Sequence, residues 1–323
     1  MKTQTQTKTQ VIEFEQVVER GCGMDVHKET VVATVAGIGI KPETRTFSTF
    51  TNSLKELKEW LKSLEITTVA MESTGVYWKP IFNILEADFE VLLVNARHVK
   101  NVPGHKTDKR DSRWLTKLLL SGLLKGSFIP PVEIRQLRDL FRYKRKLTGQ
   151  VSAEKNRLQK ILEDANLKLS SVVSDTFGVS ATRIIEALLA GEEDIEELLK
   201  LCHGKLKPKE AEMKEALVGK LTEHHKFMLR TIKESIKQIE EIIAKVDRQI
   251  DVQTKAYEVE IELLQTIPGV GKDSAIGIIA EIGVEMEQFP SELHLASWAG
   301  MSPGNNESAG KKKADAPRTE INI

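Results

Sequence analysis

Short apolar segments alternate with amphipathic ones through 17–94, and this order limits the fold more than any single motif does. β-Branched and aromatic residues in 17–35 and 41–50 flank Gly37-Ile38-Gly39, which predicts a hairpin of two strands. Residues 54–64 carry apolar side chains at the spacing of an amphipathic helix. A strand at 66–71, a helix at about 77–87 and a strand at 90–94 follow. Strand pair, helix, strand, helix and strand is the order of an α/β domain with crossover connections.

The remainder of the chain is mainly helical. After a helix at about 107–124, Pro130-Pro131 is predicted to end the first domain. Apolar residues recur at near-helical spacing in 132–166 and again in 211–251, which predicts two long helices around a shorter, more acidic helical insert. Such a pair is typical of an antiparallel coiled-coil arm, which would serve dimerisation or act as a spacer. A plain helical domain is the alternative.

Four segments are therefore predicted. They are a disordered leader at 1–16, an α/β domain at 17–130, a helical coiled-coil arm at 131–258 and a small, mainly α-helical C-terminal domain at 259–323. The leader has no apolar core, which excludes a secretory signal, and no apolar run approaches the ~20 residues that span a bilayer. We therefore expect a cytoplasmic protein with no membrane partner. The two cysteines, Cys22 and Cys202, form no Cys-x-x-Cys pair, so neither a disulfide framework nor a zinc site is indicated.

The charge is balanced over the whole chain but not within it. Lys and Arg number 47, as do Asp and Glu, yet 95–160 holds 17 basic against five acidic residues. A local excess of this size favours a polyanionic partner; a solvated helical surface is the alternative. The candidate nucleic-acid contacts in and near this segment are Arg97, Lys100, Lys106, Lys109, Arg110, Arg142, Lys144, Arg145 and Lys146.

A Pro-Gly-x-Gly turn lies between two predicted helices near the C-terminus. Turns of this kind present backbone N–H groups to a phosphate, and the N-terminus of the next helix adds its positive end. Gly269, Gly271 and Lys272 are therefore further candidate nucleic-acid contacts. A simple tight turn between packed helices is the alternative.

Four carboxylates are the candidate catalytic groups. Asp25 and Glu72 lie at or near the ends of apolar strands, and Asp108 and Asp111 are three residues apart, on one helix face. Carboxylates brought close together repel one another, and either a raised pKa or bound divalent cations relieve this repulsion. Oxygen ligands without clustered His or Cys favour Mg²⁺ or Mn²⁺. Two such ions about 4 Å apart can clamp the attacking and leaving oxygens of a phosphodiester. Taken singly, each acid has the alternative of a solvated or helix-capping residue.

Six motifs occur in a fixed order along the chain. They are Gly23-Met24-Asp25-Val26-His27-Lys28, Met71-Glu72-Ser73-Thr74-Gly75-Val76-Tyr77-Trp78, Val94-Asn95-Ala96-Arg97, Lys106-Thr107-Asp108-Lys109-Arg110-Asp111, Ile267-Pro268-Gly269-Val270-Gly271 and Leu295-Ala296-Ser297-Trp298-Ala299-Gly300-Met301-Ser302-Pro303. Together they closely resemble the DEDD-type insertion-sequence transposases. The resemblance covers nearly the whole chain.

The resemblance implies an RNase H-like, RuvC-like N-terminal domain and a recombinase that cuts and rejoins DNA strands. Its four acids would bind Mg²⁺, and a serine of the C-terminal domain would attack DNA to give a covalent phosphoserine link. The matching residue is Ser308, for which an ordinary loop serine is the alternative from the sequence alone. The implied partners are DNA element ends and target DNA, with a structured guide RNA in some members. The predicted arm adds the expectation of a homo-oligomer formed through it.

The chain departs from the family pattern at its end. After Lys311-Lys312-Lys313 the family pattern leads one to expect a Gly-Asn turn and further helices, and 314–323 shows neither. The expectation is a truncated or frame-shifted chain with an intact metal site and weak or absent full transposition. The alternative functions are a RuvC-like junction endonuclease without serine chemistry and an inactive, truncated DNA- or RNA-binding derivative.

Overall fold

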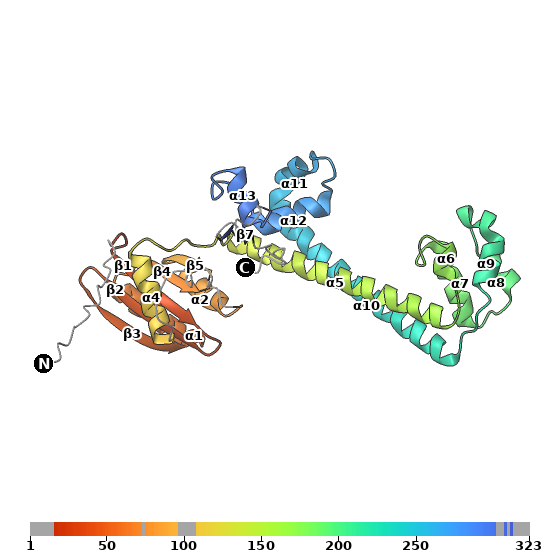
Figure 1. Cartoon of the computed structure of the whole chain (residues 1–323), viewed down its shortest axis with the longest axis horizontal. Coiled ribbons are helices and arrows are strands. Elements are labelled where there is room, and N and C mark those ends of the chain that lie inside the picture. Colours follow the sequence, from red (N-terminus) through yellow and green to blue (C-terminus); the bar gives the residue numbers. More distant parts are fainter. Residues whose placement is uncertain (1–15, 73–74, 96–107, 302–306, 309–310, 313–323) are drawn as a thin grey trace. The chain divides into compact units, whose positions relative to one another are not determined.

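The computed structural model describes residues 16–72, 75–95, 108–301, 307–308 and 311–312. The chain divides into two compact units, which are described separately. The first unit comprises 1–129 and 287–323, and the second unit comprises 130–286 (Figure 1). The predicted domain boundaries differ in placing 259–286 with the C-terminal segment, and they stay predictions. The predicted leader lies, except for Gln16, outside the described residues.

The first unit is built on a five-stranded sheet in the order β3-β2-β1-β4-β5. Its strands are β1 (Arg20–Val26), β2 (Thr30–Gly37), β3 (Ile40–Ser48), β4 (Thr68–Glu72) and β5 (Glu90–Val94). β2 runs antiparallel to both β1 and β3, whereas β4 runs parallel to both β1 and β5. This order and these directions confirm the RNase H-like fold that the resemblance implies.

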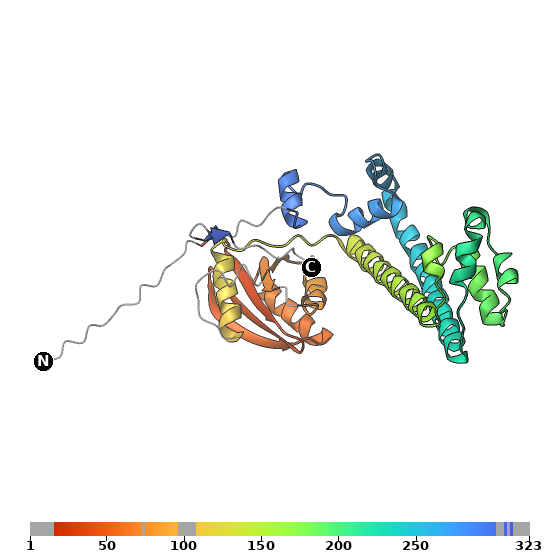
Figure 2. The ribbon, with the colours of Figure 1, turned by 45° about the vertical axis from the view of Figure 1, so that its right-hand side comes forward.

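Helices cover both faces of this sheet because successive strand residues point to opposite sides. On one face α1 (Thr51–Ser63) and α2 (Trp78–Leu85) bury their apolar stripes against side chains such as Met24 and Met71. On the other face lies α4 (Asp108–Leu120), drawn in yellow in Figure 2. The apolar contacts of α4 with this face are made by Leu115 and Leu119 against Ala70 and Val94.

Residues 17–35 were expected to form one arm of a hairpin, and this expectation is wrong. The segment forms two antiparallel strands, β1 and β2, joined by a turn that the bond from the His27 N–H to the Thr30 carbonyl closes at 2.9 Å. The polar turn contains neither Gly nor Pro, so it lacked the usual signal. The expected turn at Gly37-Ile38-Gly39 does join β2 to β3.

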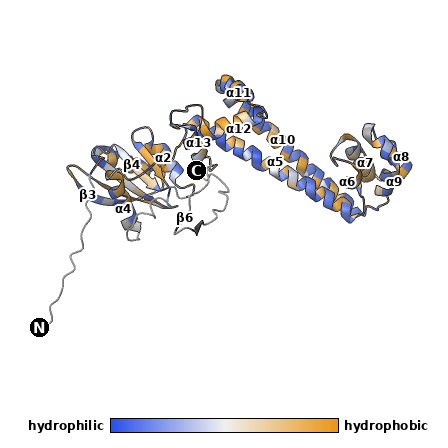
Figure 3. Cartoon of the chain, turned by 45° about the horizontal axis from the view of Figure 1, so that its top comes forward, coloured by the Kyte–Doolittle hydropathy of each residue, from blue (hydrophilic) through white to orange (hydrophobic). Residues whose placement is uncertain are grey.

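The second unit contains a long helical arm, in which hydrophilic and hydrophobic residues alternate along the helices (Figure 3). Its helices are α5 (Val132–Asp164) and α10 (Glu223–Thr254). The start of α5, with Leu137, shares a core with the end of α10, with Ile250. The end of α5, with Leu162, shares another core with the start of α10, with Leu229. The two helices are therefore antiparallel, as predicted.

The second long helix does not run unbroken over 211–251, which corrects that prediction. α9 (Glu210–Ala216) ends first, and α10 begins only after Thr222, whose hydroxyl caps it by accepting the His225 N–H at 3.2 Å. The intervening turn packs on the end of α5, because the Lys220 N–H donates to the Ala165 carbonyl at 3.1 Å. A Cβ on Gly219 would lie 2.6 Å from that same carbonyl oxygen, so the turn requires glycine.

Small helices complete both ends of the arm. The tip holds α6 (Leu169–Val172), α7 (Val179–Ala190), α8 (Ile195–Leu199) and the 3₁₀ turn η1 (Gly204–Lys209), together with α9. The base holds the 3₁₀ turn η2 (Lys255–Tyr257), α11 (Glu258–Gln265) and α12 (Lys272–Ile282). In the first unit, α13 (Glu292–Trp298) contributes Trp298 to an aromatic cluster with Phe128 and Phe289, and the short strands β6 (Glu307–Ser308) and β7 (Lys311–Lys312) pair antiparallel. Within the described ranges, none of the helices has the length and apolar character needed to cross a bilayer.

Candidate active site

Asp25 and Glu72 lie side by side at the carboxyl ends of two neighbouring parallel strands. The β1–β4 register pairs Met24 with Met71, and one of the two acids follows directly on each strand. Two residues earlier, Gly23 and Ala70 are also paired, and both face α4. Because strand side chains alternate between faces, both acids lie on the α4 side of the sheet.

The direction of α4 brings its first turn to the same place. A Cβ on Gly21 would touch the Leu119 side chain near the end of α4, whereas a Cβ on Gly23 would meet the backbone of Ser112, one turn after the helix begins. Contacts therefore move toward the N-terminus of α4 as β1 proceeds toward Asp25. The next step along β1 places Asp25 beside the first turn of α4, which carries Asp111 and begins at Asp108.

The described acids are only partly exposed. The Asp25 side chain is 13% exposed, and its Oδ2 lies 3.1 Å from Nε2 of His27. Glu72 and Asp111 are also half-buried. The side chain of Asp108 lies outside the described residues. The fold thus brings the backbone positions of Asp25, Glu72 and Asp111 to one edge of the sheet.

An all-oxygen set of this kind fits the preference of Mg²⁺ and Mn²⁺ for carboxylate ligands. Within the described part of the chain, no three His, Cys, Asp or Glu side chains already converge on one point. The backbone positions of Asp25, Glu72 and Asp111 agree with a shared site.

Several predicted site residues are described only in part. Arg97, Lys100 and Lys106 lie outside the described residues, and Lys109 and Arg110 are described only as backbone of α4. Ser308 lies in β6 opposite Lys311 of β7, and its side chain is likewise outside the described residues. The roles predicted for all of these residues stay predictions.

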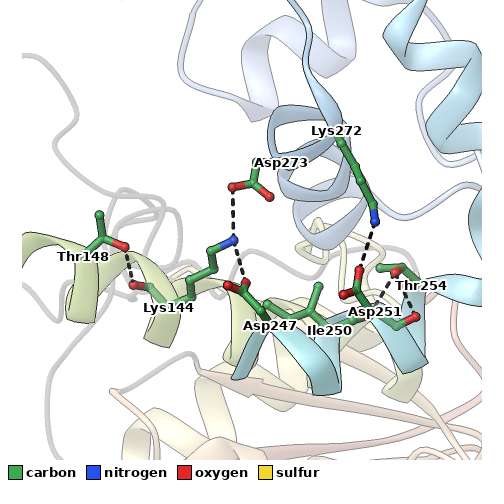
Figure 4. Close-up of polar contacts among 8 residues, drawn as sticks. All are labelled: Lys144, Thr148, Asp247, Ile250, Asp251, Thr254, Lys272 and Asp273. Atoms are coloured by element: carbon green, nitrogen blue, oxygen red, sulfur yellow. Dashed lines mark hydrogen bonds and ion pairs between the residues drawn. The ribbon is translucent and has the colours of Figure 1, made fainter. Parts of the chain in front are cut away.

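Two of the predicted nucleic-acid contacts, Arg142 and Lys144, form partly buried ion pairs within the second unit. Arg142 donates to both carboxylate oxygens of Glu281, at 2.8 and 2.7 Å. The ammonium of Lys144 lies 2.7 Å from Asp247 and 3.0 Å from Asp273 (Figure 4). Burial lowers the pKa of Lys144, but its bonds to the two carboxylates outweigh burial and raise that pKa overall. These side chains fasten α12 to α5 and α10.

The remaining predicted contacts are more open to solvent. Lys272 pairs with Asp251 at 3.0 Å, but both side chains are well exposed (Figure 4). Arg145 and Lys146 are exposed on α5. Gly269 has φ of +87°, which favours glycine, and a Cβ on Gly269 or Gly271 would meet no atom within 4 Å. The turn before α12 is therefore sterically open.

Sequence reasoning missed the residues that seat α4 on the sheet. Gly23 lets the α4 backbone approach β1, and Thr34, Ser112 and Thr116 form buried hydrogen bonds there. A signal was present, because Gly21 and Gly23 alternate within an otherwise apolar strand, a pattern that marks close backbone approach.

Two transposase family models match segments of this chain. Residues 22–167 match the IS110-type DEDD family, described as Transposase, and residues 261–320 match the family described as Transposase IS116/IS110/IS902 family. A search of curated proteins gave no match. Among solved structures, T. thermophilus RuvC in complex with Holliday junction substrate is similar over 34% of this chain and 99% of RuvC, with 11% identity and a TM-score of 0.26. DEDD transposases generally use divalent metal ions, in keeping with the oxygen-only donor set.

Proposed function

Because the chain belongs to the IS110 family of DEDD-type DNA transposases, we propose that it cuts and rejoins the ends of its own element in a reaction that needs Mg²⁺ or Mn²⁺. The observation that carries the metal requirement is the placement of Asp25 and Glu72 at adjacent strand ends, on the sheet face that α4 covers. Asp108 and Asp111 on the first turn of α4 complete the proposed set.

Each acid has a definite part in this proposal. Asp25 and Glu72 hold cations from the sheet, and Asp108 and Asp111 hold them from the helix. When bound, such ions polarise a phosphoryl oxygen and stabilise the charge that develops on the attacking and leaving oxygens. His27, which contacts Asp25 at 3.1 Å, would orient this carboxylate from outside the ligand set.

Ser308 is the proposed nucleophile of the covalent step. Its Oγ would form a bond to phosphorus while the bond from phosphorus to one deoxyribose oxygen breaks. The serine proton passes to a base and the departing oxygen gains a proton, so the DNA ends in a phosphoserine link and a free hydroxyl. A serine hydroxyl needs such activation because it is a weak nucleophile by itself. The support for Ser308 is its place within the segment that matches the transposase family.

DNA is the expected partner of a transposase, and the finer assignments are proposals. Arg145 and Lys146, exposed on α5, suit contacts with phosphates. We propose the same role for Arg97, Lys100, Lys106, Lys109, Arg110, Arg142, Lys144, Gly269, Gly271 and Lys272. A structured guide RNA and a homo-oligomer formed through the arm complete the proposed set of partners.

The metal site is tested by cleavage of labelled element ends by the purified chain in Mg²⁺. Asp25→Asn and Glu72→Gln should each abolish cleavage, because each removes a negatively charged ligand while keeping the side-chain size. Glu43→Gln is the matched control, since this carboxylate lies on the same sheet but is exposed on β3 and pairs with Arg45. Wild-type rates in Asp25→Asn and Glu72→Gln would refute the assignment.

The covalent step is tested in the same reaction by denaturing gels. A protein–DNA adduct that Ser308→Ala removes would support serine chemistry. Cleavage by the wild type with no adduct would instead indicate a water nucleophile, as in a junction endonuclease. Binding of DNA with no cleavage by the wild type would indicate a derivative without catalytic activity.

A further inference from the structure

Three buried hydroxyl groups lie where α4 packs on the sheet. Thr34 of β2 and Ser112 and Thr116 of α4 have exposed fractions of 3%, 0% and 2%. Apolar side chains could fill this space, and a buried hydroxyl is unfavourable unless it is hydrogen-bonded. Each of the three hydroxyls is bonded, so the interface gains directional contacts in place of purely apolar ones.

The bonds of Thr116 connect α4 to two strands. The Gly23 N–H of β1 donates to Thr116 Oγ1 at 3.0 Å. The hydroxyl of Thr116 lies 2.7 Å from the Ser112 carbonyl and 2.9 Å from the Thr34 carbonyl of β2, and its proton serves one of them at a time. Thr116 therefore binds the backbone of its own helix and of the sheet.

Thr34 extends the connection across the sheet. Its Oγ1 lies 2.8 Å from Ser112 Oγ and 2.9 Å from Thr44 Oγ1 on β3. Thr44 Oγ1 also accepts a bond from Nε of Arg113 at 3.2 Å. A hydroxyl can accept and donate at once, so Thr44 can accept from Arg113 and still share a hydrogen bond with Thr34. The hydroxyl chain, defined as Thr44, Thr34, Ser112 and Thr116, thus joins β1, β2 and β3 to α4.

The hydroxyl chain can fix the position of α4 along its axis, which the apolar contacts alone leave undetermined. Leu115 and Leu119 pack on Ala70 and Val94, and such contacts are non-directional. Hydrogen bonds hold their atoms to within a few tenths of an ångström and to a narrow angle. A slide of α4 along its axis would break them, and one full turn would move Asp111 by about 5.4 Å.

We propose that Thr34, Ser112 and Thr116 are positioning residues that hold the first turn of α4, and Asp111 with it, in register with Asp25. This inference rests on the proposed function, because the position of α4 along β1 matters to the site only if Asp25 and Asp111 bind the same metal ions. Ser112 is adjacent to Asp111 in the chain, and Gly23 lies two residues before Asp25 on β1. The same bonds therefore anchor both sides of the proposed metal site.

The test measures Mn²⁺ binding to the DNA-free chain by electron paramagnetic resonance. Thr116→Val keeps the shape of the side chain but removes its hydroxyl, and we expect Mn²⁺ affinity to fall by about 10-fold or more, as for other supports of metal ligands. Amide hydrogen exchange at Gly23 should become faster, because its acceptor is lost. Thr116→Ser restores the hydroxyl and should return both readouts close to wild type.

A second variant separates positioning from general loss of stability. Val35 is fully buried in the apolar core on the opposite face of the sheet, so Val35→Ala should lower the melting temperature without weakening Mn²⁺ binding. Equal weakening in Val35→Ala and Thr116→Val would overturn the inference, as would unchanged binding in Thr116→Val.

Failure of the inference and failure of the proposed function give different results. If the wild type binds Mn²⁺ and Asp111→Asn weakens that binding while Thr116→Val does not, only the positioning role is wrong. If the wild type does not bind Mn²⁺, or Asp25→Asn and Asp111→Asn bind it as the wild type does, the proposed metal site is wrong and the positioning role falls with it.

Discussion

Gly23 should be the more sensitive of the two β1 glycines that face α4. A Cβ at this position would lie 2.5 Å from the Thr116 backbone nitrogen and 2.6 Å from the Ser112 carbonyl oxygen. Ordinary contact begins near 3.4 Å, and helix backbone cannot rotate away as a side chain can. In Gly23→Ala, α4 must therefore withdraw from β1 by about 1 Å, and a misplacement of that size can lower a catalytic rate by about 10²-fold.

The stability of the same variant gives a second magnitude. Overpacking of this kind typically destabilises by about 1–3 kcal/mol, which corresponds to a melting temperature lower by about 2–12 °C in a unit of this size. The assays are thermal unfolding followed by circular dichroism and Mg²⁺-dependent cleavage of element ends. Both should be measured on the full chain below the melting temperature of the variant.

Gly21→Ala is the matched comparison. Gly21 lies on the same strand and faces the same helix, but its added Cβ would meet a Leu119 methyl group at 2.8 Å, and this flexible side chain can turn aside. We expect Gly21→Ala to retain most of the cleavage rate. The reasoning is refuted if Gly23→Ala proves no more harmful than Gly21→Ala in either assay.

Three further results are expected. Arg138→Met should destabilise the second unit by about 2–3 kcal/mol in urea unfolding, because the buried guanidinium donates to carbonyls in the last turn of α12 at 3.0 and 2.5 Å. The control, Arg145→Met at an exposed position, should change the free energy of unfolding by less than ~0.5 kcal/mol. Equal effects of the two substitutions would contradict this expectation. Burial raises the pKa of the Cys22 thiol, so iodoacetamide at about pH 8 should modify it only after unfolding, and mass spectrometry showing rapid labelling of the folded chain would disprove the burial. DNA affinity measured by fluorescence anisotropy should fall between ~50 and ~200 mM salt as phosphate contacts release counterions, and a salt-independent affinity would argue against phosphate contacts.

Local sequence patterns were sufficient to predict the helices and strands whose apolar residues recur with a strong period. The strand predicted at 90–94 is β5. The prediction succeeded because a short apolar run bounded by polar turns is typical of a buried strand. The helix predicted at 132–166 is α5, within two residues at its end. The break near Gly219 was missed because Leu217 and Leu221 keep the helical spacing across it. There the turn is decided by contact with the end of α5, which a local pattern does not contain.

In the candidate site, too, one part could be predicted from local sequence and another part depends on tertiary packing. That Asp25 and Glu72 share an edge follows from two strands that end in acids, and the strand pairing confirms their adjacency. The place of Asp111 could not be predicted, since it depends on how closely α4 approaches the sheet. That approach is set by Gly23 and by Thr116, more than 90 residues apart in the chain and in contact only once the sheet has formed.

The arm has a fixed length because its two ends belong to different cores. Ile134 and Leu137 anchor α5 in the core of the base, and Leu158 and Leu162 anchor it in the core of the tip. A continuous helix of 33 residues is about 50 Å long. Such a rod spans about 15 base pairs of duplex at 3.4 Å per pair. Groups bound at the tip and at the base would thus be held about one and a half turns of double helix apart, and inserting or deleting residues in α5 and α10 together would change that separation in steps of 1.5 Å per residue.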